Sequence, residues 1–292
     1  MDLVLTCTEH LGDSDVAQRD ETLFSDPRVI NNLLNDEVFS VPKCDYFKAV
    51  QSDVQPYMRK VVATWMLEVC EEQTCEDQLL PLAINVMDRF LCECPVRKQQ
   101  LQLLGATCLL IASKIRCTRL LPVDLLCAYT DHSVTKQQIL SWELLVLSKL
   151  QWNASAVTGF DYIDHVIERC EWGDENHLLR KHAHILVAIC YTEPALIQTA
   201  PSVIAAACVS SAVRGLKLPT AEAASRDVCR MLNADPATIE SLVCLIDGAV
   251  SKATPGVAEP MDAQTTKTVQ GGYESPQYGQ PETPTEVEKV YI

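Results

Sequence analysis

Apolar residues recur at three- and four-residue spacing through most of the chain, which is the pattern of amphipathic helices. No run shows the sustained alternation and the Asn-Gly type turns of β-hairpins, and the prolines fall at the edges of the apolar segments. The pattern therefore predicts an all-α fold, in which a short leading helix at 27–34 precedes two sets of five helices. The first set is expected at 54–72, 76–92, 97–115, 122–129 and 134–150, and the second at 158–171, 175–192, 200–214, 220–232 and 236–250.

The third helix of each set has an unusual composition. Residues 105–113 (GATCLLIAS) and 202–212 (SVIAAACVSSA) are small and apolar on every face. A helix that is apolar all round must be surrounded by other helices, and small side chains let those neighbours approach closely. Each set is thus predicted to be a five-helix bundle around a central helix, which makes an internal repeat of about 100 residues.

The two ends of the chain have a different composition from the middle. Residues 1–25 are polar and acidic, and residues 251–292 are rich in Pro, Thr, Gln and Glu. Neither end can bury enough apolar surface to fold alone, so flexible tails are expected. The predicted organisation is a tail at 1–25, a first bundle at 26–153, a second bundle at 154–252 and a second tail at 253–292.

Charge and glycine content exclude several classes of protein. The 292 residues include 24 Lys and Arg against 39 Asp and Glu, which gives a net charge of −15. This excess argues against nucleic acid as a direct partner, since affinity for phosphates comes largely from basic side chains. The 10 glycines form no phosphate-binding loop and no nucleophile elbow, so a nucleotide enzyme is not expected.

The sequence also predicts an intracellular protein without a cofactor. The first residues, MDLVLTC, lack the basic region of a signal peptide, and no stretch reaches the roughly 18 apolar residues of a membrane span, so no membrane association is expected. The 14 cysteines contain no C-x-x-C pair and lie scattered in apolar patterns, so we expect reduced, mostly buried thiols. Examples are Cys70, Cys108, Cys190, Cys208 and Cys244.

Short-spaced metal-ligating residues and two tryptophans have plain structural interpretations. His182 with His184, and Cys92 with Cys94, lack a complementary second pair at zinc-site spacing, so no metal site is expected. Trp142 and Trp152 are predicted to anchor the core at the last helix of the first bundle and at its exit. An all-α metal-dependent enzyme would need paired acidic clusters such as Asp-Asp-x-x-Asp, which the sequence lacks.

Five segments of the first bundle carry a family resemblance. They are 58–72 (MRKVVATWMLEVCEE), 81–91 (PLAINVMDRFL), 101–114 (LQLLGATCLLIASK), 129–131 (YTD) and 142–152 (WELLVLSKLQW). In this order and spacing they resemble the cyclin box, especially that of the D-type cyclins. The resemblance is close over residues 45–155 and looser afterwards, where 180–183 (RKHA) and 201–203 (PSV) still match. It implies two tandem cyclin boxes and a non-catalytic subunit that activates cyclin-dependent kinases, namely kinases 4 and 6, at the G1/S transition.

The helix at 54–72 has more apolar surface than one bundle face requires. Met58, Val61, Val62, Trp65 and Val69 form one stripe, and Ala63, Met66, Leu67 and Cys70 form a second beside it. From periodicity alone, the surplus is either a second internal contact or an exposed patch for a partner. The resemblance favours the patch, because it aligns Met58, Val61, Val62 and Trp65 with the cyclin surface that binds Arg-x-Leu motifs of substrates and of Cip/Kip-type inhibitors. It aligns Glu68, Gln102 and Asp131 with the polar rim of that surface.

Lys114 and Glu143 are charged residues within stretches that otherwise look buried. They either pair internally and only stabilise the fold, or they contact a partner. The resemblance implies that they bind the kinase helix that carries the catalytic glutamate. Beyond Lys114 the chain departs from the family, because Cys117 replaces an acid and Arg116 and Arg119 make the loop basic.

Two further motifs lie in the predicted tails. Leu5, Cys7 and Glu9 form an L-x-C-x-E sequence, whose residues share one side of an extended peptide. The resemblance implies that it binds the pocket of retinoblastoma-family proteins. Thr283 precedes a proline, as in the phosphodegron of D-type cyclins, and Ser275-Pro276 is a second such step.

The resemblance to the D-type phosphodegron implies phosphorylation, nuclear export with both nuclear and cytoplasmic localisation, and destruction through a ubiquitin ligase. The alternative functions are a cyclin-fold transcription factor and a transcriptional-kinase cyclin. The factor would need a basic surface, against which the net charge speaks.

Overall fold

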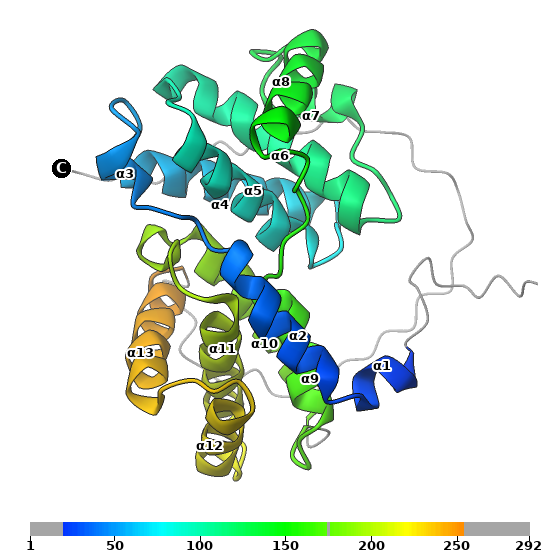
Figure 1. The fold of residues 1–292 in the computed structure, drawn as a ribbon, viewed down its shortest axis with the longest axis vertical. Helices are drawn as coiled ribbons and strands as arrows, with labels where there is room; N and C mark the ends of the chain where they lie inside the picture. The colour runs from blue at the N-terminus through cyan, green and yellow to red at the C-terminus, as the bar shows by residue number, and fades with distance from the viewer. Residues whose placement is uncertain (1–19, 174–175, 254–292) are drawn as a thin grey trace, which may run out of the picture.

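Two helical bundles follow one another in the computed structural model, which describes residues 20–173 and 176–253 (Figure 1). Three short helices and one 3-10 turn precede or join the bundles: α1 (Glu21–Ser25), α2 (Arg28–Asp36), η1 (Glu37–Phe39) and α3 (Tyr46–Ala49). The first bundle contains α4 (Pro56–Glu72), α5 (Leu79–Glu93), η2 (Lys98–Gln100), α6 (Leu101–Arg116), α7 (Val123–Tyr129) and α8 (Lys136–Lys149). The second contains α9 (Gly159–Glu168), α10 (Leu178–Thr192), η3 (Pro194–Leu196), α11 (Pro201–Gly215), α12 (Ala221–Met231) and α13 (Pro236–Ala253).

The third helix of each bundle is its centre, as the sequence predicts. Helix α6 is buried from Leu101 to Ser113 except at Gln102, and it packs against α4, α5 and α8. Helix α11 is enclosed in the same way by α9, α10, α12 and α13. A buried hydroxyl group inside α6 is hydrogen-bonded within the helix, since Thr107 donates to the Leu103 carbonyl at 2.7 Å. The all-α, two-bundle prediction is confirmed, and no strand occurs in the described residues.

Helices α1 and α3 were not expected from the pattern. Helix α1 lies in the stretch that the composition assigns to a flexible tail, and its local cap is formed by Asp20, which accepts a hydrogen bond from the Thr22 N–H at 2.9 Å. Tertiary contact holds it, because the Phe24 ring stacks on His165 of α9 with centroids 4.5 Å apart. A five-residue helix has little intrinsic stability, so the contact with α9 decides its presence.

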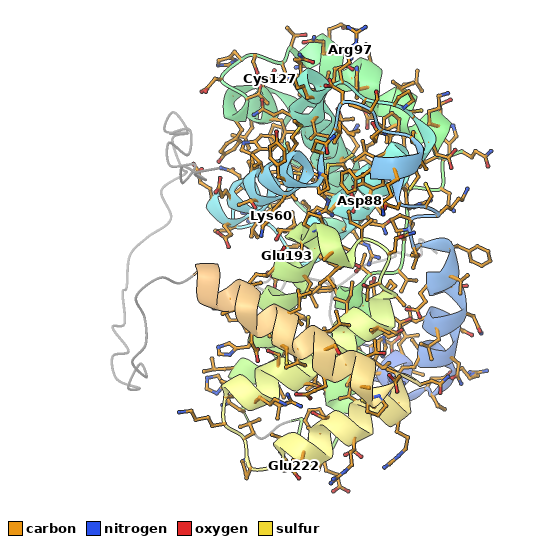
Figure 2. All side chains as sticks on the ribbon, turned by 90° about the vertical axis from the view of Figure 1, so that its left-hand side faces the viewer. Lys60, Asp88, Arg97, Cys127, Glu193 and Glu222 are labelled. Carbon is orange, nitrogen blue, oxygen red and sulfur yellow. The ribbon has the colours of Figure 1, made fainter. Side chains whose placement is uncertain are left out.

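The leading segment also joins the bundles. Glu37 is buried and accepts hydrogen bonds from the Tyr162 hydroxyl at 3.0 Å and from the Ser202 N–H and hydroxyl at 2.8 Å. Thus η1 is fixed to α9 and α11 of the second bundle. Across the boundary between the bundles, Lys60 of α4 pairs with Glu193 at 2.7 Å (Figure 2).

None of the helices in the described part of the chain combines the length and the apolar character that crossing a bilayer requires.

Candidate functional site

Lys114 and Glu143 form an ion pair on the surface of the first bundle. Lys114 lies in the last turn of α6, Glu143 lies in the middle of α8, and the ammonium and carboxylate are 2.5 Å apart. The lysine side chain is 43% exposed and the glutamate 16%. The structure therefore brings together the two residues that the sequence singles out. A surface pair of this kind contributes only about 0–1 kcal/mol to stability, so stability alone is a weak reason for it.

Exposed apolar side chains lie close in the chain to both residues of this ion pair. On α8, the residue directly after Glu143 is Leu144, which is 60% exposed. Leu140 and Leu144 share one side of α8 with Glu143 and are exposed, as is Ile115, which follows Lys114 on α6. We call Ile115, Leu140 and Leu144, with Lys114 and Glu143, the α6–α8 face. Clustered apolar side chains in solvent around a charged pair are typical of a surface that binds another protein.

The two apolar stripes of α4 are buried to different extents. Ala63, Met66 and Cys70 of the second stripe are buried, together with Val69 from the first. The rest of the first stripe is only partly covered: Met58, Val62 and Trp65 are half-buried, and Val61 is 49% exposed. One side of α4 is thus core, and the other is an apolar surface, which we call the α4 patch (Met58, Val61, Val62 and Trp65). Both interpretations that periodicity left open apply in part, because Val61 is exposed, whereas Met58, Val62 and Trp65 also pack against the core.

The crossing of α4 over α6 positions this patch. A Cβ on Gly105 would lie 2.9 Å from Cγ1 of Val62 and 3.3 Å from Sδ of Met66, so glycine permits the close approach of the two helices. Gln102 lies one turn before Gly105 on the same side of α6, and it is half-buried. The close contact thus places the Gln102 face of α6 beside the α4 patch.

The other two predicted rim residues are Glu68, near the C-terminal end of α4, and Asp131, in a turn that is hydrogen-bonded to that end. Glu68 follows Trp65 by one turn, and partial burial, helped by the charge of Glu71, raises the pKa of Glu68. Asp131 is exposed in the turn after α7, with φ of 51°. That turn is tied to α4, because the Gln73 amide donates to the Tyr129 hydroxyl at 2.6 Å.

Trp65 adds a polar atom to the α4 patch. Its indole Nε1 is buried and has no hydrogen-bond partner within the described residues. Buried N–H groups are nearly always paired in folded proteins. The indole N–H of Trp65 is an exception to this rule.

Sequence reasoning missed a buried ion pair beneath the same helix. Arg59 is 1% exposed, and its guanidinium pairs with Asp88 of α5 at 2.6 Å and donates to the Thr192 carbonyl of the second bundle at 2.7 Å. The Tyr46 hydroxyl also donates to Asp88, at 2.8 Å. Burial opposes the charge, but the attraction of Asp88 outweighs it and raises the pKa of Arg59. The spacing could have predicted that Arg59 is buried, because Arg59 precedes buried Ala63 by one helical turn.

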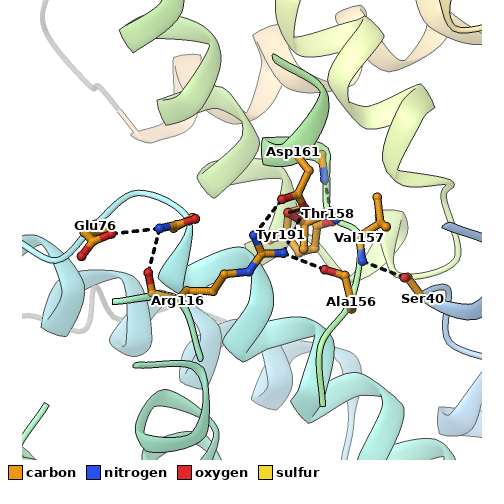
Figure 3. A network of polar contacts seen from close by, with 10 residues as sticks. Ser40, Glu76, Arg116, Ala156, Val157, Thr158, Asp161 and Tyr191 are labelled. Carbon is orange, nitrogen blue, oxygen red and sulfur yellow. Dashed lines mark hydrogen bonds and ion pairs between the residues drawn. The ribbon is translucent and has the colours of Figure 1, made fainter. Parts of the chain in front are cut away.

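Arg116 has a more specific role than the predicted basic loop. Its guanidinium pairs with Asp161 of α9 at 2.8 Å and donates to the Ala156 carbonyl at 3.0 Å (Figure 3). The same Asp161 carboxylate accepts from the Thr158 N–H at 2.7 Å and caps α9. Arg116 therefore joins the end of α6 to the start of the second bundle, and its charge is neutralised.

The prediction that Trp152 is a core anchor is wrong. Its side chain is 68% exposed, because the residue lies beyond the end of α8 in a turn with φ of 61° that points the ring outward. Trp142 is half-buried and packs on Phe90, with ring centroids 6.2 Å apart, as an anchor should. Cys244, expected to be buried, is exposed on α13.

His184 lies between two carboxylates rather than in a metal site. Its Nδ1 is 3.5 Å from Asp77 of the first bundle, and its Nε2 is 3.5 Å from Asp164 of α9. Burial lowers the pKa of His184, but the two carboxylates outweigh burial, so the pKa lies above its ordinary value of 6.5. In the described residues, no group of three His, Cys, Asp or Glu side chains is arranged to hold a metal ion.

Two of the predicted motifs lie outside the described residues. They are the L-x-C-x-E sequence of Leu5, Cys7 and Glu9, and the Thr-Pro step at Thr283.

Comparison with known proteins agrees with this architecture. The cyclin N-terminal domain matches residues 28–155, and the cyclin C-terminal domain matches residues 157–283. The solved structure of a viral cyclin from herpesvirus saimiri superposes with a TM-score of 0.67 at 24% identity, covering 78% of this chain and 98% of the viral one, and shows the same fold. The chain belongs to the cyclin family.

Its curated relatives are more specific. G1/S-specific cyclin-D2 of Xenopus laevis is 49% identical over 207 residues, which are 70% of this chain and 71% of the relative. G1/S-specific cyclin-D1 of Homo sapiens is 42% identical over 248 residues, or 81% and 84% of the two chains. The cyclin-D1 of Rattus norvegicus is 38% identical over 283 residues, or 94% and 95%. Within the family, this chain is a D-type cyclin, a non-catalytic regulatory subunit of a cyclin-dependent kinase in the cell cycle.

Proposed function

We propose that the chain binds and activates cyclin-dependent kinases 4 and 6 and directs them to retinoblastoma-family proteins, which promotes the passage from G1 into S phase. The observation that carries the proposal is the α6–α8 face, where the ion pair of Lys114 and Glu143 lies among exposed leucines. The G1/S-specific cyclins D1 and D2 among the relatives support the assignment to this stage of the cell cycle.

In the proposed mechanism the chain positions a helix of the kinase and takes no part in the chemical step. The α6–α8 face packs against the kinase helix that carries the catalytic glutamate, with the leucines burying apolar area and the ion pair fixing the register. Moving that helix inward completes the kinase lysine–glutamate ion pair that orients the ATP phosphates. An activator of this kind needs no nucleotide site of its own, in agreement with the absence of Gly-rich phosphate loops in the sequence.

A double charge reversal tests this contact sharply. In Lys114→Glu with Glu143→Lys the two charges still attract each other, so the internal pair persists while the charges presented to a partner are inverted. We expect co-purification with kinases 4 and 6 and activation of either kinase to fall by at least tenfold, which corresponds to about 1.4 kcal/mol.

The matched control reverses the exposed pair of Arg214 and Glu240, which joins α11 and α13 in the second bundle. This control should leave binding unchanged. If the Lys114 and Glu143 double variant binds and activates the kinase as the unmodified chain does, the pair is an internal feature of the fold and the proposed contact is refuted.

The α4 patch is proposed to recruit substrates and Cip/Kip-type inhibitors through Arg-x-Leu peptides. The half-buried Trp65 offers its unpaired N–H to the peptide backbone, and exposed Val61 offers apolar surface to the leucine. The acids Glu68 and Asp131, with Gln102, form the rim, where a carboxylate would pair with the peptide arginine.

A substitution at the most exposed position of the patch separates recruitment from activation. Val61→Glu should raise the KM for substrates that carry an Arg-x-Leu motif and leave kcat unchanged for a short substrate without one. The exposed Leu245 on α13 provides a control, Leu245→Glu, which should change neither constant. An unchanged KM for the motif-bearing substrate in Val61→Glu would exclude the patch as the docking surface.

The tail motifs complete the proposal. Leu5, Cys7 and Glu9 bind the retinoblastoma-family pocket, and Thr283 is phosphorylated, which leads to nuclear export and to destruction through a ubiquitin ligase. The chain is accordingly proposed to move between nucleus and cytoplasm. Thr283→Ala should retain the protein in the nucleus and lengthen its half-life in a chase experiment, and an unchanged half-life would refute the role of Thr283.

A further inference from the structure

Three cysteines meet where α4 ends. Cys70 lies in the last turn of α4, Cys75 follows in the loop toward α5, and Cys117 follows α6. The Cys70 and Cys75 thiols are close enough to affect each other's pKa, and Cys117 lies close enough to raise the pKa of Cys70. All three are free thiols. Cys70 is buried, whereas Cys75 and Cys117 are partly exposed.

The backbone turn that ends α4 brings Cys70 and Cys75 together. The Cys75 N–H donates to the Cys70 carbonyl at 2.9 Å, the Thr74 N–H donates to the Glu71 carbonyl at 3.1 Å, and Thr74 has φ of 47°. These two bonds around a left-handed residue define a Schellman motif, in which the side chains of its first and last residues usually make a hydrophobic contact. Here both residues are cysteines, so the contact is between two thiols.

The two thiols differ in reactivity. Interaction with the Cys70 thiol lowers the pKa of the Cys75 thiol, whereas interaction with Cys75, together with burial, raises the pKa of the Cys70 thiol. The thiolate is the nucleophilic form of cysteine, so Cys75 is the attacking thiol and Cys70 is the neighbour that resolves the product. Partial exposure gives a small oxidant access to Cys75.

We propose that Cys75 and Cys70 form a reversible disulfide when the protein meets hydrogen peroxide. The Cys75 thiolate attacks one peroxide oxygen, the O–O bond breaks, and hydroxide leaves and takes up a proton to become water. The Cys75 sulfenic acid is then attacked by the Cys70 sulfur, which forms the S–S bond and releases a second water. Two thiols lose two electrons and two protons, and one peroxide becomes two waters.

The location of this thiol pair links it to the rest of the first bundle. Next to Cys75, the Glu76 carboxylate accepts hydrogen bonds from the Thr118 N–H at 2.7 Å and from the Gln78 amide at 2.9 Å. Gln78 in turn donates to the Arg116 carbonyl at 2.7 Å. The disulfide would thus form at the start of the loop between α4 and α5, which these hydrogen bonds hold against the end of α6.

The experiment treats the full chain with hydrogen peroxide, blocks remaining thiols with N-ethylmaleimide and maps the peptides by mass spectrometry. We expect the number of free thiols to fall by two, with Cys70 and Cys75 joined, and dithiothreitol to restore both. In Cys75→Ser, Cys70 should stay reduced at the same peroxide dose. In Cys70→Ala, Cys75 should stop at the sulfenic acid, which dimedone traps.

Two internal controls exclude the simpler explanations. Cys190 and Cys208 have sulfurs 3.6 Å apart but are both buried, so this pair should stay reduced, which shows that closeness alone is insufficient. Cys244 is exposed and should be oxidised more slowly than Cys75. The proposal is overturned if Cys75 reacts no faster than Cys244, or if the bond that forms joins Cys75 to Cys117.

Discussion

Replacing Arg59 by methionine should destabilise the protein strongly, because it breaks the buried ion pair beneath α4. The substitution keeps a similar apolar volume but leaves the Asp88 carboxylate, which is 5% exposed, without its cation. It also leaves the Thr192 carbonyl without the guanidinium donor that joins the two bundles. Removing one partner of a buried pair costs about 3–5 kcal/mol, and total stabilities are about 5–15 kcal/mol. The hydrogen bond from Tyr46 to Asp88 remains and offsets only part of this loss.

Urea unfolding followed by far-UV circular dichroism measures this effect. Three companion variants make the interpretation specific. Asp88→Asn should be similarly destabilised, and Arg59→Met with Asp88→Asn should lose less than the sum of the two single variants, because no unpaired charge is then buried. Arg214→Met, in an exposed pair, should change the midpoint little. The reasoning is wrong if Arg59→Met and Arg214→Met shift the midpoint equally, or if the double variant shows simple additivity.

Three further predictions concern packing, pH and the leading segment. Gly105→Ala should destabilise the first bundle by about 1–3 kcal/mol, because the added Cβ would press on Val62. Gly215→Ala is the control and should not destabilise the protein, because a Cβ there meets nothing within 4 Å. Thermal unfolding of both variants measures the difference. Two carboxylates raise the pKa of His184, so its stabilisation is complete below its ordinary pKa of 6.5 and is lost as pH rises through the raised value. The loss of unfolding free energy in His184→Gln should therefore shrink from pH 6 to pH 8.5 in a series of denaturation experiments. A loss that does not vary with pH would contradict this. Glu37→Ala should cost about 1–3 kcal/mol because it leaves three buried donors unpaired, and faster proteolysis of the leading helices would report it.

Periodicity predicted the helices because it is a local property. Each of the eleven expected segments is a helix whose ends shift by at most a few residues, as at Pro56–Glu72, Val123–Tyr129 and Lys136–Lys149. The small apolar composition of α6 and α11 correctly indicated central helices. Helix α5, expected from 76, begins at Leu79, because 76–78 are used in contacts to the end of α6 and the loop after it. The short helices α1 and α3 give no periodic signal, and contact with other elements holds α1 in place.

The candidate sites were predictable only in part. Sequence identified Lys114 and Glu143 as charges in need of partners, but only the packing of α6 on α8 shows that each is the partner of the other. Trp152 lies in a pattern that looks buried, and a left-handed turn places it in solvent instead. A residue's exposure depends on the direction of the chain at that point, which a count of apolar neighbours does not contain.

The sequence by itself determined that this protein is a pair of helical bundles with apolar centres, and that α4 has more apolar surface than its bundle needs. The tertiary structure decided which side of α4 is core, because the close approach at Gly105 fixes the rotation of the helix. It also decided that Arg59 is inside and joins the two bundles through Asp88 and Thr192. Helix formation depends on neighbours along the chain, whereas the pairing of a buried charge depends on residues that meet only after the bundles have packed.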